Sequence, residues 1–181
     1  MRPKGRKGNI MTFTEFLSTV FTGTNLALLG AVLAVAFSGF GSARGVGMVS
    51  EASAGLLTED PTKFGKAMVL QALPATQGIY GFVIAFLIAV VKLDIMSGSP
   101  VTLTVGQGMY LFCAALPIAL GGWVSAIKQA RVATAGISVL AKRPEAVGKA
   151  IISAALVEMY AILAFLISIL LVLSFNPGAA A

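Results

Sequence analysis

The chain has 181 residues, of which 57% are hydrophobic and only 11% are charged. This composition leaves too little polar surface to cover a soluble globule, so we expect an integral membrane protein. The net charge of +6 does not indicate a nucleic-acid partner, because basic residues of membrane proteins gather in cytoplasmic loops. Histidine is absent and Cys113 is the only cysteine, which excludes imidazole chemistry and an intrachain disulfide.

Four long apolar stretches follow one another, each with about the 20 residues that a helix needs to cross a bilayer. They span roughly residues 21–41, 67–91, 105–127 and 151–175. Apolar residues do not alternate along them as they would in the strands of a barrel. The sequence therefore predicts an all-α membrane protein with four transmembrane helices. We expect a basic N-terminal tail over residues 1–20, a first helical hairpin over 21–98 and a second over 101–175.

The two predicted hairpins are copies of one another. Shifting the sequence by 83 residues aligns identical residues across both halves: Ser42 and Ala43 with Ser125 and Ala126, Pro61 with Pro144, Gly65 to Ala67 with Gly148 to Ala150, Leu73 with Leu156, and Phe82 with Phe165. A duplicated hairpin is the simplest origin of such a repeat. Stripes of alanine, glycine and serine in the first and third stretches predict close helix packing. This packing could be that within one monomer; because both stripes belong to the first helix of a hairpin, they also fit a tight ring or wall built from many copies.

Basic residues predict the orientation across the membrane. The first and third loops are rich in lysine and arginine, whereas the second loop carries only Lys92, so the first and third loops are expected in the cytoplasm and both termini outside. The basic tail opposes this assignment. It could be the start of a signal peptide, lie upstream of a true start at Met11, or be translocated despite its charge.

One carboxylate, Glu158, lies inside the otherwise uncharged run from residue 151 to 173. A charge at the centre of a bilayer costs roughly 2.5–3.5 kcal/mol on the mildest scale, so such a residue usually marks an ion or proton pathway. Its counterpart in the first hairpin is Ala75, so one carboxylate serves two hairpins.

Helix geometry predicts which side chains lie at the depth of Glu158. Gln129 and Glu158 are equally far from the expected turn at Arg143 and Pro144. In the first hairpin the same depth falls beside a set of residues with the spacing of one helical face: Leu73, Thr76, Gln77 and Tyr80. Pro74 lacks an N–H and is expected to bend this helix.

This convergence of oxygen atoms favours a hard cation such as sodium, since a proton carrier needs only the carboxylate. Each side chain also has an ordinary alternative. Thr76 could bond to its own helix, Tyr80 could be an interfacial aromatic, and both glutamines could join helices by hydrogen bonds.

With these residues in place, the chain resembles the duplicated proteolipid of V-type and A-type rotary ATPases, the c-ring or K subunit. The resemblance lies in the stretches FSGFGSARGVGMVSEASAG, LQALPATQGIYGFVIAFLI, SAIKQARVATAGI, AKRPE and AALVEMYAILAFLISILLVL. It implies a non-catalytic rotor subunit in a prokaryotic cell membrane, with four kinds of partner: identical subunits in a ring, a stator subunit with an arginine, a central-stalk subunit at the cytoplasmic loops, and lipid.

In sodium-translocating members of that family, the resemblance implies an ion held by Glu158, by side-chain oxygens of Thr76, Gln77 and Gln129, and by the Leu73 carbonyl. Tyr80 would hydrogen-bond the glutamate. Two other functions remain open from the sequence. One is a proton-carrying ring of the same family, and the other is a small four-helix transporter that exchanges protons for a cationic drug.

Overall fold

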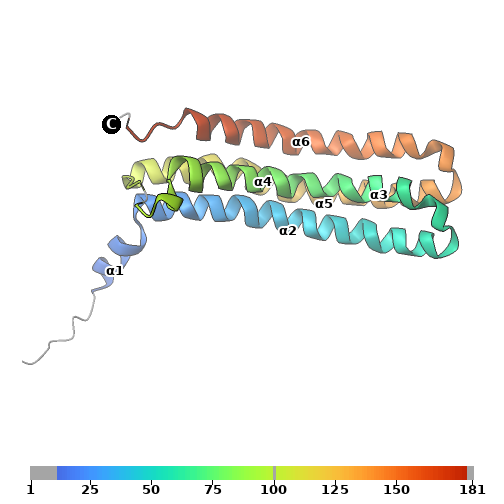
Figure 1. Ribbon diagram of the computed structural model, residues 1–181, viewed down its shortest axis with the longest axis horizontal. Helices are drawn as coiled ribbons and strands as arrows, with labels where there is room; N and C mark the ends of the chain where they lie inside the picture. The colour runs from blue at the N-terminus through green and yellow to red at the C-terminus, as the bar shows by residue number, and fades with distance from the viewer. Residues whose placement is uncertain (1–11, 100, 179–181) are drawn as a thin grey trace, which may run out of the picture.

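The computed structural model describes residues 12–99 and 101–178 and is an elongated bundle of four long helical segments (Figure 1). Short turns join the segments at the two ends of the bundle. No strand occurs in these two ranges, and four helical segments are long and apolar enough to cross a membrane. The predicted all-α membrane fold is confirmed.

The first and third segments are continuous helices, whereas the second is interrupted. A short helix, α1 (Phe13–Val20), precedes α2 (Gly23–Glu59). The second segment consists of η1 (Pro61–Lys63), α3 (Phe64–Ala72), η2 (Leu73–Ala75), α4 (Thr76–Phe86) and the π-helical η3 (Leu87–Lys92). The turn η4 (Ile95–Ser97) leads to α5 (Val105–Lys142), and η5 (Pro144–Ala146) leads to α6 (Val147–Ser174).

α2 and α5 are much longer than the apolar stretches that predict them. They have 37 and 38 residues. At about 1.5 Å per residue this exceeds the roughly 30 Å hydrocarbon layer, so both helices continue beyond the bilayer. The buried face of α2 continues past the apolar stretch through Gly45, Val49, Ser53 and Leu56 at helical spacing, and this contact supports the helix where hydropathy has already fallen.

α2 and α5 lie side by side and parallel, with their backbones in contact. A Cβ atom added to Gly23 would lie 2.1 Å from the Thr104 carbonyl oxygen, and one added to Gly41 would lie 2.7 Å from the Cα of Trp123. Contacts therefore advance along both helices in the same direction. Glycine is required at these positions because any side chain would force the two helices apart.

The second hairpin turn lies where the sequence places it, at Arg143 and Pro144, since α5 ends at Lys142. The first turn follows the end of α2 at Glu59. Lysines of the first turn also hold the second. Lys63 Nζ donates to the Ala141 carbonyl oxygen at 3.1 Å, and Lys66 Nζ donates to that of Pro144 at 3.3 Å. The Ala141 carbonyl lies in the last turn of α5, where unpaired carbonyls and the helix dipole favour a cation. Together the two contacts join the hairpins at one end of the bundle.

Candidate functional site

Glu158 lies on α6 with its half-buried carboxylate facing the second segment and α5. Its Oε1 accepts hydrogen bonds from Thr76 Oγ1 at 2.7 Å and from the Tyr80 hydroxyl at 2.9 Å. Its Oε2 accepts a longer bond from Gln129 Nε2 at 3.4 Å. All three partners donate. Two hydroxyl groups and one amide thus surround the carboxyl group of Glu158 with hydrogen-bonding partners.

Two fully buried glutamines form the inner wall of the site. Gln77 on α4 and Gln129 on α5 are both 0% exposed, and Gln77 Nε2 donates to Gln129 Oε1. Gln77 Oε1 is buried without a hydrogen-bond partner among the described residues. A buried acceptor left unpaired costs about 1–3 kcal/mol, so this oxygen is a place where a cation would be stabilised.

Pro74 shapes the backbone beside the glutamate. It lies in the 3-10 turn η2, which separates α3 from α4 and places Thr76 at the start of the new helix. Pro74 is itself buried, and a Cβ on Gly45 of α2 would lie 2.9 Å from its ring. Thr76 Oγ1 lies 3.1 Å from the Leu73 carbonyl oxygen, so this carbonyl also belongs to the oxygen cluster.

The structure thus brings all six residues singled out in the sequence to one place. Thr76, Tyr80 and Gln129 contact Glu158 directly, while Gln77 and Leu73 join through a hydrogen-bonded neighbour. Three basic residues at similar depth, Arg44, Lys128 and Arg131, are exposed on the outside of the bundle.

Three further residues support the site and were not predicted to do so. Ser125 Oγ donates to the Val157 carbonyl oxygen at 3.0 Å, next to the glutamate, and the Gly78 N–H donates to Ser42 Oγ at 2.7 Å. Phe165 stacks on Tyr80 with 5.1 Å between ring centroids, which fixes the phenol. The internal repeat could have indicated these residues, because Ser42 and Ser125 are identical at matching positions and Phe165 matches Phe82.

The donor set narrows the kind of ion. Within residues 12–99 and 101–178, no group of three or more histidine, cysteine, aspartate or glutamate side chains could hold a metal. Transition metals favour histidine nitrogen and cysteine sulfur, whereas hard cations take carboxylate, amide, hydroxyl and carbonyl oxygens. The cluster around Glu158 contains only the second kind.

Comparison with known proteins gives concordant results. The family model for the C subunit of ATP synthase matches residues 29–88 and again residues 112–171, two segments displaced by the same 83 residues as the internal repeat. The V-type sodium ATPase subunit K of Enterococcus hirae is 53% identical over 160 residues, covering 88% of this chain and 98% of the relative. The A-type ATP synthase subunit K of Methanocaldococcus jannaschii is 41% identical over 153 residues, covering 84% of this chain and 64% of that one.

Proposed function

Because the chain belongs to the family of ATP synthase C subunits, we propose that it is a rotor-ring subunit of a V-type rotary ATPase that carries Na+ across the membrane on Glu158. The observation that carries the choice of ion is the oxygen cluster, above all the buried and unpaired Gln77 Oε1. The relative with 53% identity is named as a sodium ATPase subunit, which agrees with this choice.

Five residues would supply oxygen to the ion: the Glu158 carboxylate, the side chains of Thr76, Gln77 and Gln129, and the Leu73 carbonyl. Gln129 Oε1 already accepts a bond from Gln77, but an amide oxygen has a second lone pair for a cation. Tyr80 would keep its hydrogen bond to the carboxylate and orient it. Sodium is cargo here, bound and released at each passage.

Electrostatics explains how such a site moves an ion. An empty, ionised Glu158 is costly to expose to lipid, whereas one neutralised by a cation can pass through lipid as the ring turns. A stator arginine on another chain would attract the empty carboxylate and release the ion on one side. The chain is thus an ion-translocating part of the ATPase, with its first and third loops in the cytoplasm against the central stalk.

The proton-carrying alternative is less well supported by the same geometry. The Thr76 hydroxyl can donate to Glu158 or to the Leu73 carbonyl oxygen, so it serves a carboxylate and a carboxyl group equally. A proton, however, leaves the buried Gln77 oxygen without a partner. The drug-transporter alternative is not favoured, because the family model matches both halves of the chain.

Labelling with a carboxyl-reactive carbodiimide tests the proposal in the assembled ATPase. We expect Glu158 to be modified in the absence of Na+ and to be protected by added NaCl but not by KCl at equal ionic strength, because a bound ion blocks the carboxylate. Glu158→Gln serves as the unlabelled control and should abolish ion-coupled ATP hydrolysis. Labelling of Glu158 that changes with pH but is unaffected by Na+ at any fixed pH would identify a proton carrier.

A further inference from the structure

We propose that α1 is an interfacial helix, whose apolar face inserts into the lipid headgroup region at the end of the bundle where the second loop lies. From there α1 holds the start of α2 at the membrane surface. In Figure 1, α1 leaves the bundle at this end, on the side of α2. The proposal concerns anchoring in the membrane and holds whichever ion the chain carries.

The short helix α1 is amphipathic, and none of its residues is buried. Its apolar residues have the spacing of one helical face: Phe13, Phe16, Leu17 and Val20. Its polar residues lie on the opposite face: Thr14, Glu15, Ser18 and Thr19. Phe13 and Phe16 are 75% and 51% exposed. A helix this short is marginal in water, so its apolar face needs a partner that covers it.

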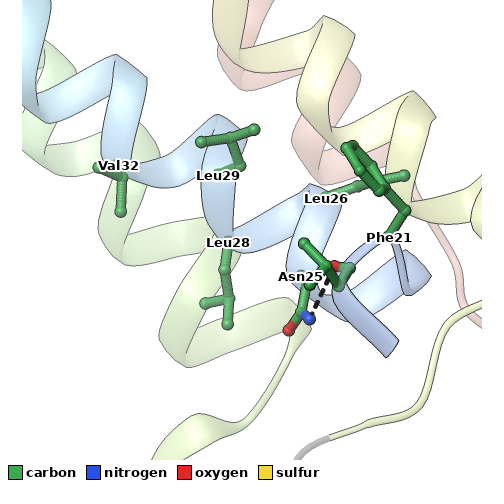
Figure 2. Close-up of a pocket in the computed structure, with 7 residues that line it drawn as sticks. Phe21, Asn25, Leu26, Leu28, Leu29 and Val32 are labelled. Atoms are coloured by element: carbon green, nitrogen blue, oxygen red, sulfur yellow. Dashed lines mark hydrogen bonds between the residues drawn. The ribbon is translucent and has the colours of Figure 1, made fainter. Parts of the chain in front are cut away.

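Both ends of α1 are nevertheless fixed by side chains. At the amino end, the Glu15 N–H donates to Thr12 Oγ1 at 3.3 Å and the Thr12 N–H donates to Glu15 Oε2 at 2.8 Å, which is a capping box. At the carboxyl end, Asn25 Nδ2 of α2 donates to the Val20 carbonyl oxygen at 2.9 Å (Figure 2). Asn25 therefore ties α1 to the first turns of α2 and sets the direction in which α1 leaves the bundle.

The apolar face of α1 continues into the part of α2 that enters the membrane. Val20 belongs to this face and lines an apolar hollow together with the residues labelled in Figure 2: Phe21, Asn25, Leu26, Leu28, Leu29 and Val32. Leu29 and Val32 are 45% and 56% exposed on a helix that is long and apolar enough to span a membrane. This continuity places the apolar face of α1 at the boundary of the membrane, where lipid is available to cover it.

The charge of the chain next to α1 fits the same partner. Four of the first seven residues are basic: Arg2, Lys4, Arg6 and Lys7. Lysine and arginine near a membrane surface are attracted to anionic headgroups. Interfacial helices combine this attraction with an inserted apolar face. The sequence before α1 thus carries the charge that lipid headgroups complement.

An anchored α1 fixes the depth of α2 in the membrane. With 37 residues α2 is about 55 Å long, whereas the hydrocarbon layer is roughly 30 Å thick. Because α1 holds the first turn of α2 at one surface, the surplus length projects at the other end, where the first loop lies. α5 begins at the same level, since a Cβ added to Gly23 would lie 2.1 Å from the Thr104 carbonyl oxygen, and its surplus projects on the same side.

Tryptophan fluorescence in proteoliposomes tests the position of α1. Trp123 is the only tryptophan of the chain, so Phe16→Trp in a Trp123→Phe background gives a single reporter on the apolar face. Its emission should shift to a shorter wavelength than in water. Lipids brominated near the headgroup should quench it more than lipids brominated at the end of the acyl chain, because interfacial helices insert only to that depth.

Ser18→Trp in the same background is the matched control, because it lies about 200° around the helix from Phe16. Its emission should stay close to that in water, without quenching. Phe13→Trp, on the apolar face, should behave as Phe16→Trp does and guards against a local effect of one substitution. Native mass should confirm that each variant keeps its assembly, and adding Glu158→Gln should leave the quenching unchanged, which separates this test from the question of the ion.

Three results would overturn the proposal. The first is equal quenching of the reporters on the two faces, or no quenching of either Phe13→Trp or Phe16→Trp. The second is a shift of both apolar-face reporters to shorter wavelength without quenching by brominated lipid, which would show that α1 packs against protein. The third is an intact mass of the purified chain that begins after Phe21, because a segment that is removed cannot anchor the protein.

Discussion

At the scale of single residues, Glu158 depends on donors far away in the sequence. Thr76 and Tyr80 precede it by 82 and 78 positions, and Gln129 by 29. The cluster also contains Gln77, which does not contact the carboxylate but holds Gln129 in place. The affinity of the site for a cation therefore depends on how three helical segments are placed, and a small change at one ligand should be measurable.

Gln77→Ala should weaken Na+ binding while the ring still assembles. The variant removes one proposed ligand oxygen, Gln77 Oε1. It also removes the hydrogen bond that Gln77 Nε2 donates to Gln129 Oε1. A hydrogen bond to a charged group contributes about 1.5–3 kcal/mol, so we expect at least a tenfold higher Na+ concentration for half-protection of Glu158. Gln71→Ala, on the preceding helix α3 and outside the cluster, is the control. Equal Na+ dependence in the two variants would contradict the role of Gln77.

At the scale of elements, the two helices of each hairpin approach closely at one glycine. This glycine lies on the second helix of the first hairpin and on the first helix of the second hairpin. In the first hairpin Gly81 of α4 packs against Ser38 of α2, where an added Cβ would lie 2.6 Å from the serine Cβ. In the second hairpin, Gly121 of α5 corresponds to Ser38 and packs against Ala164 of α6, which corresponds to Gly81. The smaller residue of the pair is therefore on the other helix. The duplicated halves thus keep the same close approach with different side chains, and the volume of each pair is conserved better than its residues.

Gly81→Ala should destabilise the first hairpin. The new methyl group would meet the Ala34 carbonyl oxygen at 2.4 Å as well as Ser38, and overpacking of this kind costs about 1–3 kcal/mol. Thermal unfolding of the solubilised protein, followed by circular dichroism, should show a lower midpoint. Gly65→Ala, beside open space, should not lower it. Ser38→Gly alone loses the buried hydrogen bond from Ser38 Oγ to the Ile118 carbonyl oxygen, and it should lower the midpoint less in the Gly81→Ala background than in the native chain. An equal effect in both backgrounds would show that the Ala34 backbone contact alone limits the packing.

At the scale of the whole molecule, the four long helical segments alternate in direction, so the loops that join them lie at the two ends of the bundle. In a membrane these two ends face opposite sides. The first and third loops lie together at one end, joined by Lys63 and Lys66. At the other end, Lys92 Nζ donates to the carbonyl oxygens of Leu173 and Phe175 at 3.2 and 2.8 Å. Both ends are thus secured by lysine, and the excess of basic residues at the first end predicts that it faces the cytoplasm.

Cysteine accessibility tests this orientation. In a Cys113→Ser background, Glu145→Cys marks the third loop and Ser97→Cys marks the second, and both positions are exposed. A membrane-impermeant thiol reagent added to inside-out vesicles stripped of the cytoplasmic part of the ATPase should label Glu145→Cys and leave Ser97→Cys unlabelled. In intact cells it should label Ser97→Cys and leave Glu145→Cys unlabelled. The opposite pattern would invert the proposed topology and place the basic N-terminal tail in the cytoplasm.

The sequence by itself determined the class of fold, the duplication and the six residues of the cluster. These depend on local properties: apolar length sets the number of spans, helical spacing sets which residues share a face, and distance from a turn sets depth. Only the tertiary structure decided how far α2 and α5 extend, which donor meets which oxygen of Glu158, and that Gln77 Oε1 is left unpaired. Those features depend on the rotation of each helix about its axis. For α2 and α5 that rotation is tied to close backbone contacts at Gly23 and Gly41, whose partners lie some 80 residues away.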